Sequence, residues 1–119
     1  MTKSGLIYYE KNPKKCRSTF FDYVPDGEYS KFIRSKQQKY DVLVVDGRDR
    51  VRCIYQGLEC LTDTGVVILD DSQRSRYSEA LEYLKQNNFK CLDLIGIKPG
   101  TSAVCQTTIA YRDNNCLGL

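Results

Sequence analysis

The sequence predicts an α/β fold: a mostly parallel sheet that ends in an antiparallel C-terminal hairpin and is flanked by about three helices. Two continuous apolar runs, residues 42–45 and 66–69, carry this prediction. Strands that are apolar throughout are typical of a parallel sheet buried on both faces, whereas half-exposed strands alternate. A segment with apolar residues at helical spacing separates the two runs, which completes a strand–helix–strand unit.

Two strands and a helix are expected ahead of this unit. Residues 6–9 form a short apolar run, and residues 17–23 are rich in β-branched and aromatic side chains, as strands are. The segment Pro-Asp-Gly at 25–27 predicts a turn. Within it, Asp26 is a candidate cap for a helix over residues 28–37.

Two further helices and two strands complete the expected order. Helices over about 50–61 and about 75–87 each show one apolar face. Strands over 90–97 and 106–112 are joined by a Pro-Gly turn without a helix, so they should run antiparallel. The apolar positions that define the helices are Val51, Ile54, Tyr55, Leu58 and Leu61 in the first and Tyr77, Ala80, Leu81 and Leu84 in the second.

Composition indicates one folded domain and argues against several classes of protein. With 41% hydrophobic and 28% charged residues, the chain is too apolar for a disordered protein. It contains no apolar stretch of about 18 residues, so no membrane span is expected. It has no histidine, and its six cysteines form no Cys-x-x-Cys pair, which argues against a zinc site. We therefore expect reduced thiols and a cytoplasmic location. Because histidine is absent, we expect any proton transfer to be carried by Asp, Glu, Lys or Tyr.

The net charge of +3 is unevenly distributed. Residues 1–40 carry nine basic and four acidic side chains, whereas residues 41–119 carry nine basic and eleven acidic ones. A basic end of this kind can contact nucleic acid. The lysines are scattered, however, so a solvated surface is the favoured interpretation and a nucleic-acid partner the weaker alternative. The nearby aromatic residues, which fit core positions of strands better than a base-stacking surface, are Tyr8, Tyr9, Phe20, Phe21 and Tyr23.

Acidic residues follow both buried strands: Asp46 after the first apolar run, and Asp70 and Asp71 after the second. The carboxyl ends of neighbouring parallel strands meet at one edge, where ligands bind in open α/β sheets. Three carboxylates held close together repel one another, so positive charge must neutralise them. Mg²⁺ with oxygen ligands is one candidate, and ion pairs with nearby arginines are the favoured alternative. Those arginines are Arg48, Arg50 and Arg74.

Other polar residues complete the predicted rim of this ligand site. Gly47 allows a tight turn, and Ser72, Asn114 and Asn115 are expected near the same edge. For the serine and the two asparagines, the favoured alternative role is capping of free backbone groups at loop and helix ends. The predicted rim therefore contains Asp46, Gly47, Arg48, Ser72, Arg74, Asn114 and Asn115, with Asp46, Asp70 and Asp71 as the candidate metal ligands.

Four segments carry a resemblance to a known family. They read YDVLVVDGRDR at 40–50, GVVILDDSQR at 65–74, NFKCLDLIGI at 88–97 and TTIAYRDNNCLGL at 107–119. In this order and spacing they resemble class I methyltransferase-like Rossmann proteins whose substrates are uncharacterised. The resemblance covers about residues 40–119.

The resemblance implies a partial Rossmann-like methyltransferase fold, S-adenosylmethionine as methyl donor and a small-molecule acceptor. It also suggests a Mg²⁺ site similar to that of catechol-type O-methyltransferases, which place an Asp at one strand end and an Asp-Asn pair at the next. The sequence departs from the family in one respect: its eight glycines are dispersed and form no glycine-rich cofactor loop. We therefore expect residues 1–119 to be a single truncated domain, incomplete or degenerate, that is inactive alone.

A non-catalytic interaction module is the alternative function. Such a module would keep this half of the sheet and use it to bind a partner. The strand at 42–45 would then have an unpaired edge, which is a template for pairing with another chain. We therefore expect a homo-oligomer or a complementary half-domain, unless residues 6–9 or 17–23 fill the vacant place.

Overall fold

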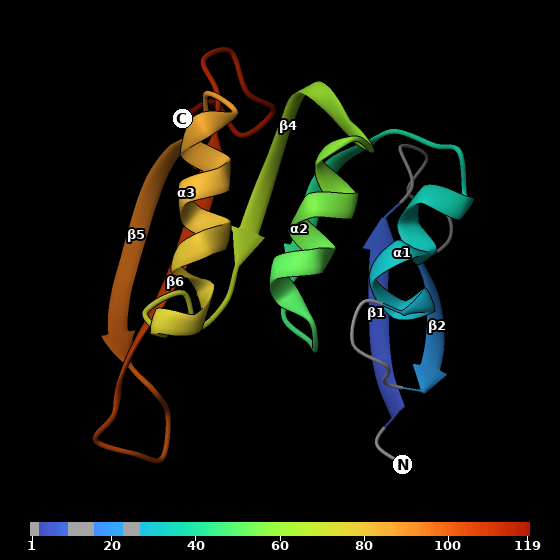
Figure 1. Ribbon diagram of the computed structural model, residues 1–119. Coiled ribbons are helices and arrows are strands. Elements are labelled where there is room, and N and C mark those ends of the chain that lie inside the picture. The colour runs from blue at the N-terminus through green and yellow to red at the C-terminus, as the bar shows by residue number, and fades with distance from the viewer. Residues whose placement is uncertain (1–2, 10–15, 23–26) are drawn as a thin grey trace.

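The computed structural model describes residues 3–9, 16–22 and 27–119, and in the first two segments it describes the backbone alone. The expected cap Asp26 and the aromatic side chains of the N-terminal strands lie outside this description. The predicted order of helices and strands is confirmed (Figure 1). In chain order the elements are β1 (Lys3–Tyr9), β2 (Cys16–Asp22), α1 (Glu28–Ser35), β3 (Tyr40–Val45), α2 (Arg50–Leu58), β4 (Leu61–Leu69), the short 3₁₀ helix η1 (Ser75–Tyr77), α3 (Ser78–Gln86), β5 (Lys90–Ile97) and β6 (Val104–Tyr111).

Helix α2 ends three residues before the predicted boundary. Leu61 fits the apolar face of the helix by its spacing, but it belongs to β4 and pairs with Tyr40. The backbone N–H of Tyr40 also donates a hydrogen bond of 2.7 Å to the carbonyl of Cys60. Leu61 therefore belongs to the sheet and not to α2. Pairing with β3 satisfies backbone N–H and C=O groups that would stay unpaired at the end of a longer helix.

The main sheet has four strands in the order β3-β4-β6-β5. Strands β3 and β4 are parallel, whereas β6 is antiparallel to both of its neighbours. The sheet is therefore mixed, and the prediction of a mostly parallel sheet is wrong. The reason is the place of β6, which returns from the hairpin and inserts between β4 and β5, so that one parallel neighbour pair remains. The β5–β6 ladder joins eight residue pairs, but the β4–β6 ladder joins three.

Helices α2 and α3 cover the same face of the main sheet (Figure 1). The core beneath α2 includes Ile54, which is fully buried. In β4 the adjacent residues Val66 and Val67 are both fully buried, so this strand is covered on both faces as predicted. In β3, however, Val44 is 40% exposed. The apolar run at 42–45 is therefore only partly explained by burial on both faces.

The N-terminal strands β1 and β2 form a separate antiparallel pair. Strand β1 lies near β3 but is not hydrogen-bonded to it. Within the described residues, β3 consequently pairs with β4 alone, and the vacant place next to β3 is not taken over by the N-terminal strands. An edge strand that has no ladder partner among the described strands on one side can accept another strand there.

The α-helices of the described segments contain eight or nine residues each. In these segments no helix has the length and apolar character that crossing a membrane requires.

The packing of α2 can be tested with a pair of substitutions on this helix. Ile54→Ala should lower the free energy of unfolding by about 2–5 kcal/mol, since it removes a fully buried side chain and leaves a cavity. Arg52→Ala, at an exposed position of the same helix, should change it by less than about 0.5 kcal/mol. Urea denaturation followed by circular dichroism measures both values, and equal effects would contradict the orientation of α2.

Candidate functional site at the carboxyl edge

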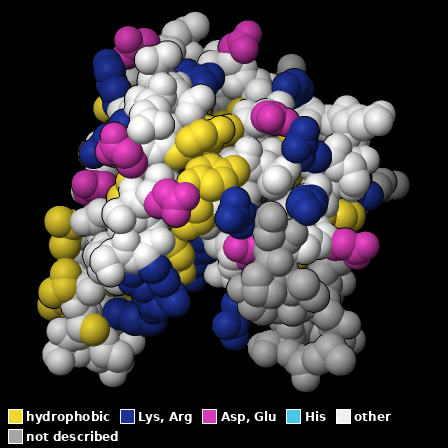
Figure 2. All heavy atoms as spheres, viewed as in Figure 1, with side chains coloured by type: hydrophobic (Ala, Val, Ile, Leu, Met, Phe, Trp, Pro, Cys, Tyr) yellow, Lys and Arg dark blue, Asp and Glu magenta, His cyan; other side chains and the backbone are white. Residues whose placement is uncertain are grey.

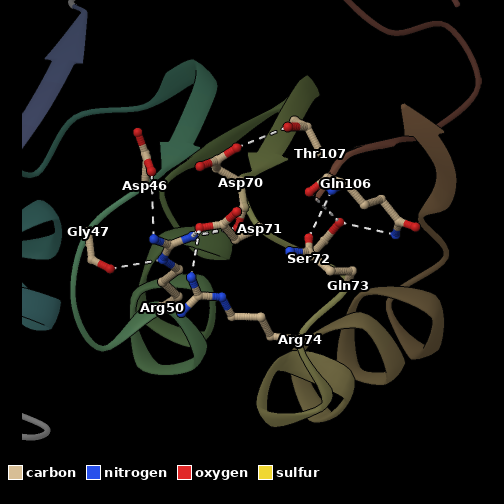
Figure 3. Close-up of polar contacts among 10 residues, drawn as sticks. All are labelled: Asp46, Gly47, Arg50, Asp70, Asp71, Ser72, Gln73, Arg74, Gln106 and Thr107. Atoms are coloured by element: carbon tan, nitrogen blue, oxygen red, sulfur yellow. Dashed lines mark hydrogen bonds and ion pairs between the residues drawn. The ribbon is translucent and has the colours of Figure 1, made fainter. Parts of the chain in front are cut away.

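The guanidinium of Arg50 lies at the carboxyl edge of the sheet, where β3 and β4 end (Figure 3). Its Nε donates a 2.8 Å hydrogen bond to the carbonyl of Gly47, and a terminal nitrogen donates to the carbonyl of Asp70. The same terminal nitrogen lies 3.9 Å from a carboxylate oxygen of Asp71, and the other lies 3.6 Å from Asp46. Only 11% of the Arg50 side chain is exposed, so solvent screens these contacts weakly. Arg50 thereby joins the loop after β3 to the loop after β4.

The start of α2 places Arg50 in this position. Asp49 has φ 50° and ψ 42°, a left-handed conformation that Asp tolerates better than most residues. The carbonyl of Asp49 accepts a hydrogen bond of 2.9 Å from the backbone N–H of Cys53, which closes the first turn of the helix. Arg50 is therefore the first helical residue, and its long side chain folds back over the loop toward the strand ends.

Asp71 interacts with two arginines. Its carboxylate lies 3.4 Å from a terminal nitrogen of Arg74, in addition to its contact with Arg50. The left-handed φ of 52° at Asp71 forms part of a turn in which the N–H of Arg74 donates to the carbonyl of Asp71 at 3.3 Å. The ion pairs favoured by the sequence thus form at Arg50 and Arg74.

Asp46 and Asp70 follow neighbouring strand ends, and each carboxyl group affects the pKa of the other. Partial burial raises the pKa of Asp46, although 62% of its side chain is exposed, and the neighbouring Asp70 raises it further. Burial acts to raise the pKa of Asp70, but the neighbouring Asp46 side chain, the hydroxyl of Thr107 at 3.0 Å, the Asp71 backbone and the charge of Arg50 together lower it. The charge on one carboxylate disfavours ionisation of the other, and Asp46 is the member of the pair whose pKa is raised.

The three aspartates do not converge on a common point that a metal ion could occupy. Their carboxylates contact Arg50, Arg74 and Thr107 instead. Among the residues that the structure describes, no group of three acidic or cysteine side chains is arranged as a set of metal ligands. The donor chemistry suits a hard cation such as Mg²⁺, but the ion would have to displace Arg50. The magnesium site therefore stays a prediction.

Ser72 is buried and fastens the loop after β4 to β6. Its backbone N–H donates to the carbonyl of Gln106 at 2.8 Å, and the side-chain amide of Gln106 donates to its hydroxyl at 3.1 Å. The hydroxyl of the fully buried Thr108 lies 2.7 Å from that of Ser72 and 2.7 Å from the carboxylate of Asp93. The hydroxyl of Ser72 in turn donates to the carbonyl of Gln106 at 3.2 Å. Ser72 thus satisfies backbone and hydroxyl groups, as the alternative interpretation expected.

Asn114 and Asn115 do not lie at the carboxyl edge, so their assignment to the rim is wrong. Strand β6 runs opposite to β4, and the chain therefore leaves β6 at the other end of the sheet (Figure 1). There the N–H of Cys116 donates to the carbonyl of Thr64 at 2.8 Å, near the beginning of β4. The side chain of Asn115 holds the C-terminal turn through hydrogen bonds of 2.9–3.1 Å with the backbone of Arg112, Leu117 and Leu119.

A cavity of about 430 Å³ opens beside Arg50. Figure 2 shows a hollow in this region of the surface, below α2, with Lys and Arg side chains along its wall. Two of the predicted rim arginines, Arg48 and Arg74, contribute to the lining, whereas the buried Ser72 does not. The lining residues are Gly47, Arg48, Asp49, Arg50, Val51, Arg74, Arg76 and Tyr77.

Sequence reasoning missed Arg76 and Tyr77 as site residues. Tyr77 was expected in the core, and it is 7% exposed, but its ring also contacts two guanidinium groups. The guanidinium carbon of Arg50 lies 5.3 Å from the ring centroid and that of Arg76 lies 5.0 Å from it. One sequence feature could have indicated this part of the site: two arginines, Arg74 and Arg76, follow closely after the end of a predicted strand.

Part of the basic N-terminal third contacts other parts of the protein. Arg34 lies 2.8 Å from the carboxylate of Glu59 and donates to the side chain of Gln56 at 2.9 Å. Lys39 donates to the carbonyl of Glu59. The side chains of residues 3–22 lie outside the description, so nucleic-acid binding at this end stays a prediction.

Comparison of the chain with protein-family models and with curated proteins found no match. The methyltransferase-like classification therefore stays a prediction from the four sequence segments.

The importance of Arg50 predicts a strong effect on stability. Arg50→Gln should lower the free energy of unfolding by about 3 kcal/mol, because it leaves the carbonyls of Gly47 and Asp70 without their donor and removes the cation beside Asp46 and Asp71. Arg50→Lys should recover only part of this loss, since an ammonium group cannot reproduce the fork of a guanidinium. Thermal and urea denaturation measure the effect, and Arg52→Gln, at an exposed position, is the control. An effect of Arg50→Gln no larger than that of the control would contradict the central role of Arg50.

The metal question has a separate test. Millimolar Mg²⁺ should leave the Tm of the unsubstituted protein unchanged and should raise that of Arg50→Gln, in which Asp46 and Asp71 become available as ligands. The additional substitution Asp46→Asn should abolish the increase. A rise in Tm of the unsubstituted protein that is lost in Asp46→Asn/Asp70→Asn would instead establish the metal site suggested by the sequence.

Proposed function

We propose that this chain is a methyltransferase-like α/β protein that contributes the carboxyl edge of a methyl-transfer site and receives the cofactor loop from a complementary domain or partner. The observation that carries the proposal is the parallel unit β3–α2–β4, followed by the antiparallel hairpin β5–β6. This arrangement supports the C-terminal half of the fold that the four sequence segments imply. The polar groups gathered after β3 and β4 support a ligand site at the corresponding edge.

The cavity does not provide a glycine-rich cradle for S-adenosylmethionine. Its lining contains one glycine, Gly47, followed by three residues with long or charged side chains. Such side chains keep a ligand from the close backbone contact that glycine permits. In addition, no strand of the described segments is hydrogen-bonded to the open side of β3, where a first strand of the complete fold would lie. We therefore assign the binding of the cofactor to a complementary domain or partner that pairs with the open side of β3.

The contribution of this chain to methyl transfer would be the positioning of the acceptor. In that reaction a substrate nucleophile attacks the methyl group of the donor, and the protein gains rate mainly by holding the reactants in line. Asp46 is the carboxylate that a substrate can reach, since 62% of its side chain is exposed against 13% for Asp71. With no histidine in the chain, Asp46 is the candidate acceptor of a proton from the nucleophile.

Isothermal titration of the 119-residue chain with S-adenosylmethionine tests the assignment of the cofactor site. We expect no binding at low-micromolar concentrations, because the chain lacks the backbone cradle that close contact with the cofactor requires. Low-micromolar binding would contradict the need for a complementary part. Repeating such a positive titration with Arg48→Gln would show whether the cofactor occupies the cavity.

A non-catalytic interaction module is the second candidate, and the β5–β6 hairpin favours it. Strand β5 is the other edge of the main sheet, and its outer half is exposed on both faces. A monomeric protein seldom exposes a contiguous apolar strand of this kind, which is also a template for edge pairing. We therefore propose a second copy of the chain as the partner at β5. The most exposed apolar residues of the β5–β6 hairpin are Leu94 at 51%, Ile95 at 69%, Ile97 at 70% and Val104 at 63%.

Light scattering with matched substitutions separates the two open edges. The unsubstituted protein should be a dimer or higher oligomer, and Ile95→Lys with Ile97→Lys should convert it to a monomer near 13.7 kDa. Val44→Lys, on β3, is the control, because this residue is exposed at the opposite side of the sheet. Dissociation by Val44→Lys alone would place the interface at β3. A monomeric unsubstituted protein would contradict an interface at either edge, β3 or β5.

A further inference from the structure

The cavity beside Arg50 is strongly basic. Four of its eight lining residues are arginines, and one lining residue, Asp49, is acidic. Two structural elements supply the arginines: Arg48 and Arg50 come from the β3–α2 connection, whereas Arg74 and Arg76 come from the segment that precedes α3. Side chains of one sign that converge on a hollow focus the electrostatic potential and attract a ligand of opposite charge.

Among the ion pairs of the described residues, carboxylates pair with Arg50 and Arg74 but not with Arg76. Asp71 is shared between Arg50 and Arg74, so a single carboxylate serves two guanidinium groups. Asp46 contacts Arg50 from outside the cavity lining. Arg76 is exposed and lies over the ring of Tyr77, and no carboxylate of the described segments pairs with it.

The beginning of α2 adds to the positive potential. The first backbone N–H groups of a helix have no partner within the helix, and this end carries partial positive charge. Acidic residues usually compensate for it. The first turn of α2 contains none, and its acidic N-cap residue, Asp49, makes no side-chain cap hydrogen bond. Instead, Arg50 and Arg52 occupy the first and third helical positions. An anion in the adjacent cavity would supply the missing negative charge.

Tyr77 gives the arginines a fixed arrangement. Its buried ring is contacted by Arg50 at 5.3 Å and by Arg76 at 5.0 Å. Stacking on an aromatic ring restricts the rotamers of a guanidinium, so less entropy is lost when its N–H groups bind a ligand. The paired N–H groups of a guanidinium match the oxygens of a phosphoryl group.

We infer that this cavity binds the phosphoryl group of a small molecule. A volume of about 430 Å³ is within the range of small-molecule sites and favours a compact ligand over an extended polymer. The oxyanion contacts Arg48 and Arg76 at the exposed side and lies close to the beginning of α2. Arg50, which is held by the strand ends, forms the inner wall. This assignment goes beyond methyl transfer and stands without it.

Isothermal titration of the complete chain at low salt tests the assignment. The probes are inorganic phosphate, the phosphate ester AMP, and adenosine as the uncharged counterpart of AMP. Phosphate and AMP should bind at millimolar concentrations or below, adenosine should not, and affinity should fall as salt rises. Arg48→Gln with Arg76→Gln should weaken binding by about tenfold or more, as expected for the loss of charge-assisted hydrogen bonds. Both residues are exposed, and an unchanged Tm shows that the variant is folded.

Arg52→Gln is the matched control, because Arg52 lies on the same helix, is exposed and does not line the cavity. It should change affinity by less than about twofold. Binding of inorganic phosphate without AMP would keep the phosphoryl site and identify the free ion as its occupant. No binding of either phosphate compound, equal binding of adenosine and AMP, or an equal loss in Arg52→Gln would overturn the proposal. So would tighter binding of a single-stranded oligonucleotide that the cavity substitutions leave unchanged.

Discussion

The carboxyl edge of this protein depends on the guanidinium of Arg50. Three aspartates follow neighbouring strands, and without a cation their mutual repulsion would push the two strand ends apart. Arg50 supplies that cation from the first position of α2, and it also satisfies the carbonyls of Gly47 and Asp70. The side chain thereby fixes the beginning of the helix against the ends of β3 and β4. It forms both the framework of the rim and the inner wall of the cavity.

Much of the fold could be predicted from periodicity, because apolar spacing reports burial directly. The pattern succeeded at Val66 and Val67, which a strand covered on both faces must bury. It was less reliable at Val44, whose exposure depends on which elements cover the second face of β3. The antiparallel β5–β6 hairpin was predicted, but the insertion of β6 between β4 and β5 was not, since a short turn sets the direction of β6 relative to β5 but not the strand on its other side.

The candidate site was predictable only where it follows strand ends. The meeting of Asp46, Asp70 and Asp71 follows from two parallel strands joined through a helix. The choice of Arg50 as their partner depends on where α2 begins, and a helix boundary is difficult to place within one or two residues. Asn114 and Asn115 were misplaced because the residues after β6 emerge at the end of the sheet set by the direction of that strand.

The short β4–β6 ladder divides the sheet into two units, and fewer residue pairs join the units to each other than join the strands within each unit. Five residues of β3 pair with β4, and eight residue pairs join β5 to β6, but three pairs connect the two halves. Polar contacts of Ser72, Gln106 and Thr107 reinforce this seam, and they are more readily exchanged for water than apolar packing. The seam is therefore the narrowest connection in the sheet, and burial of Val67 and Ala110 must hold the two halves together where the ladder is short.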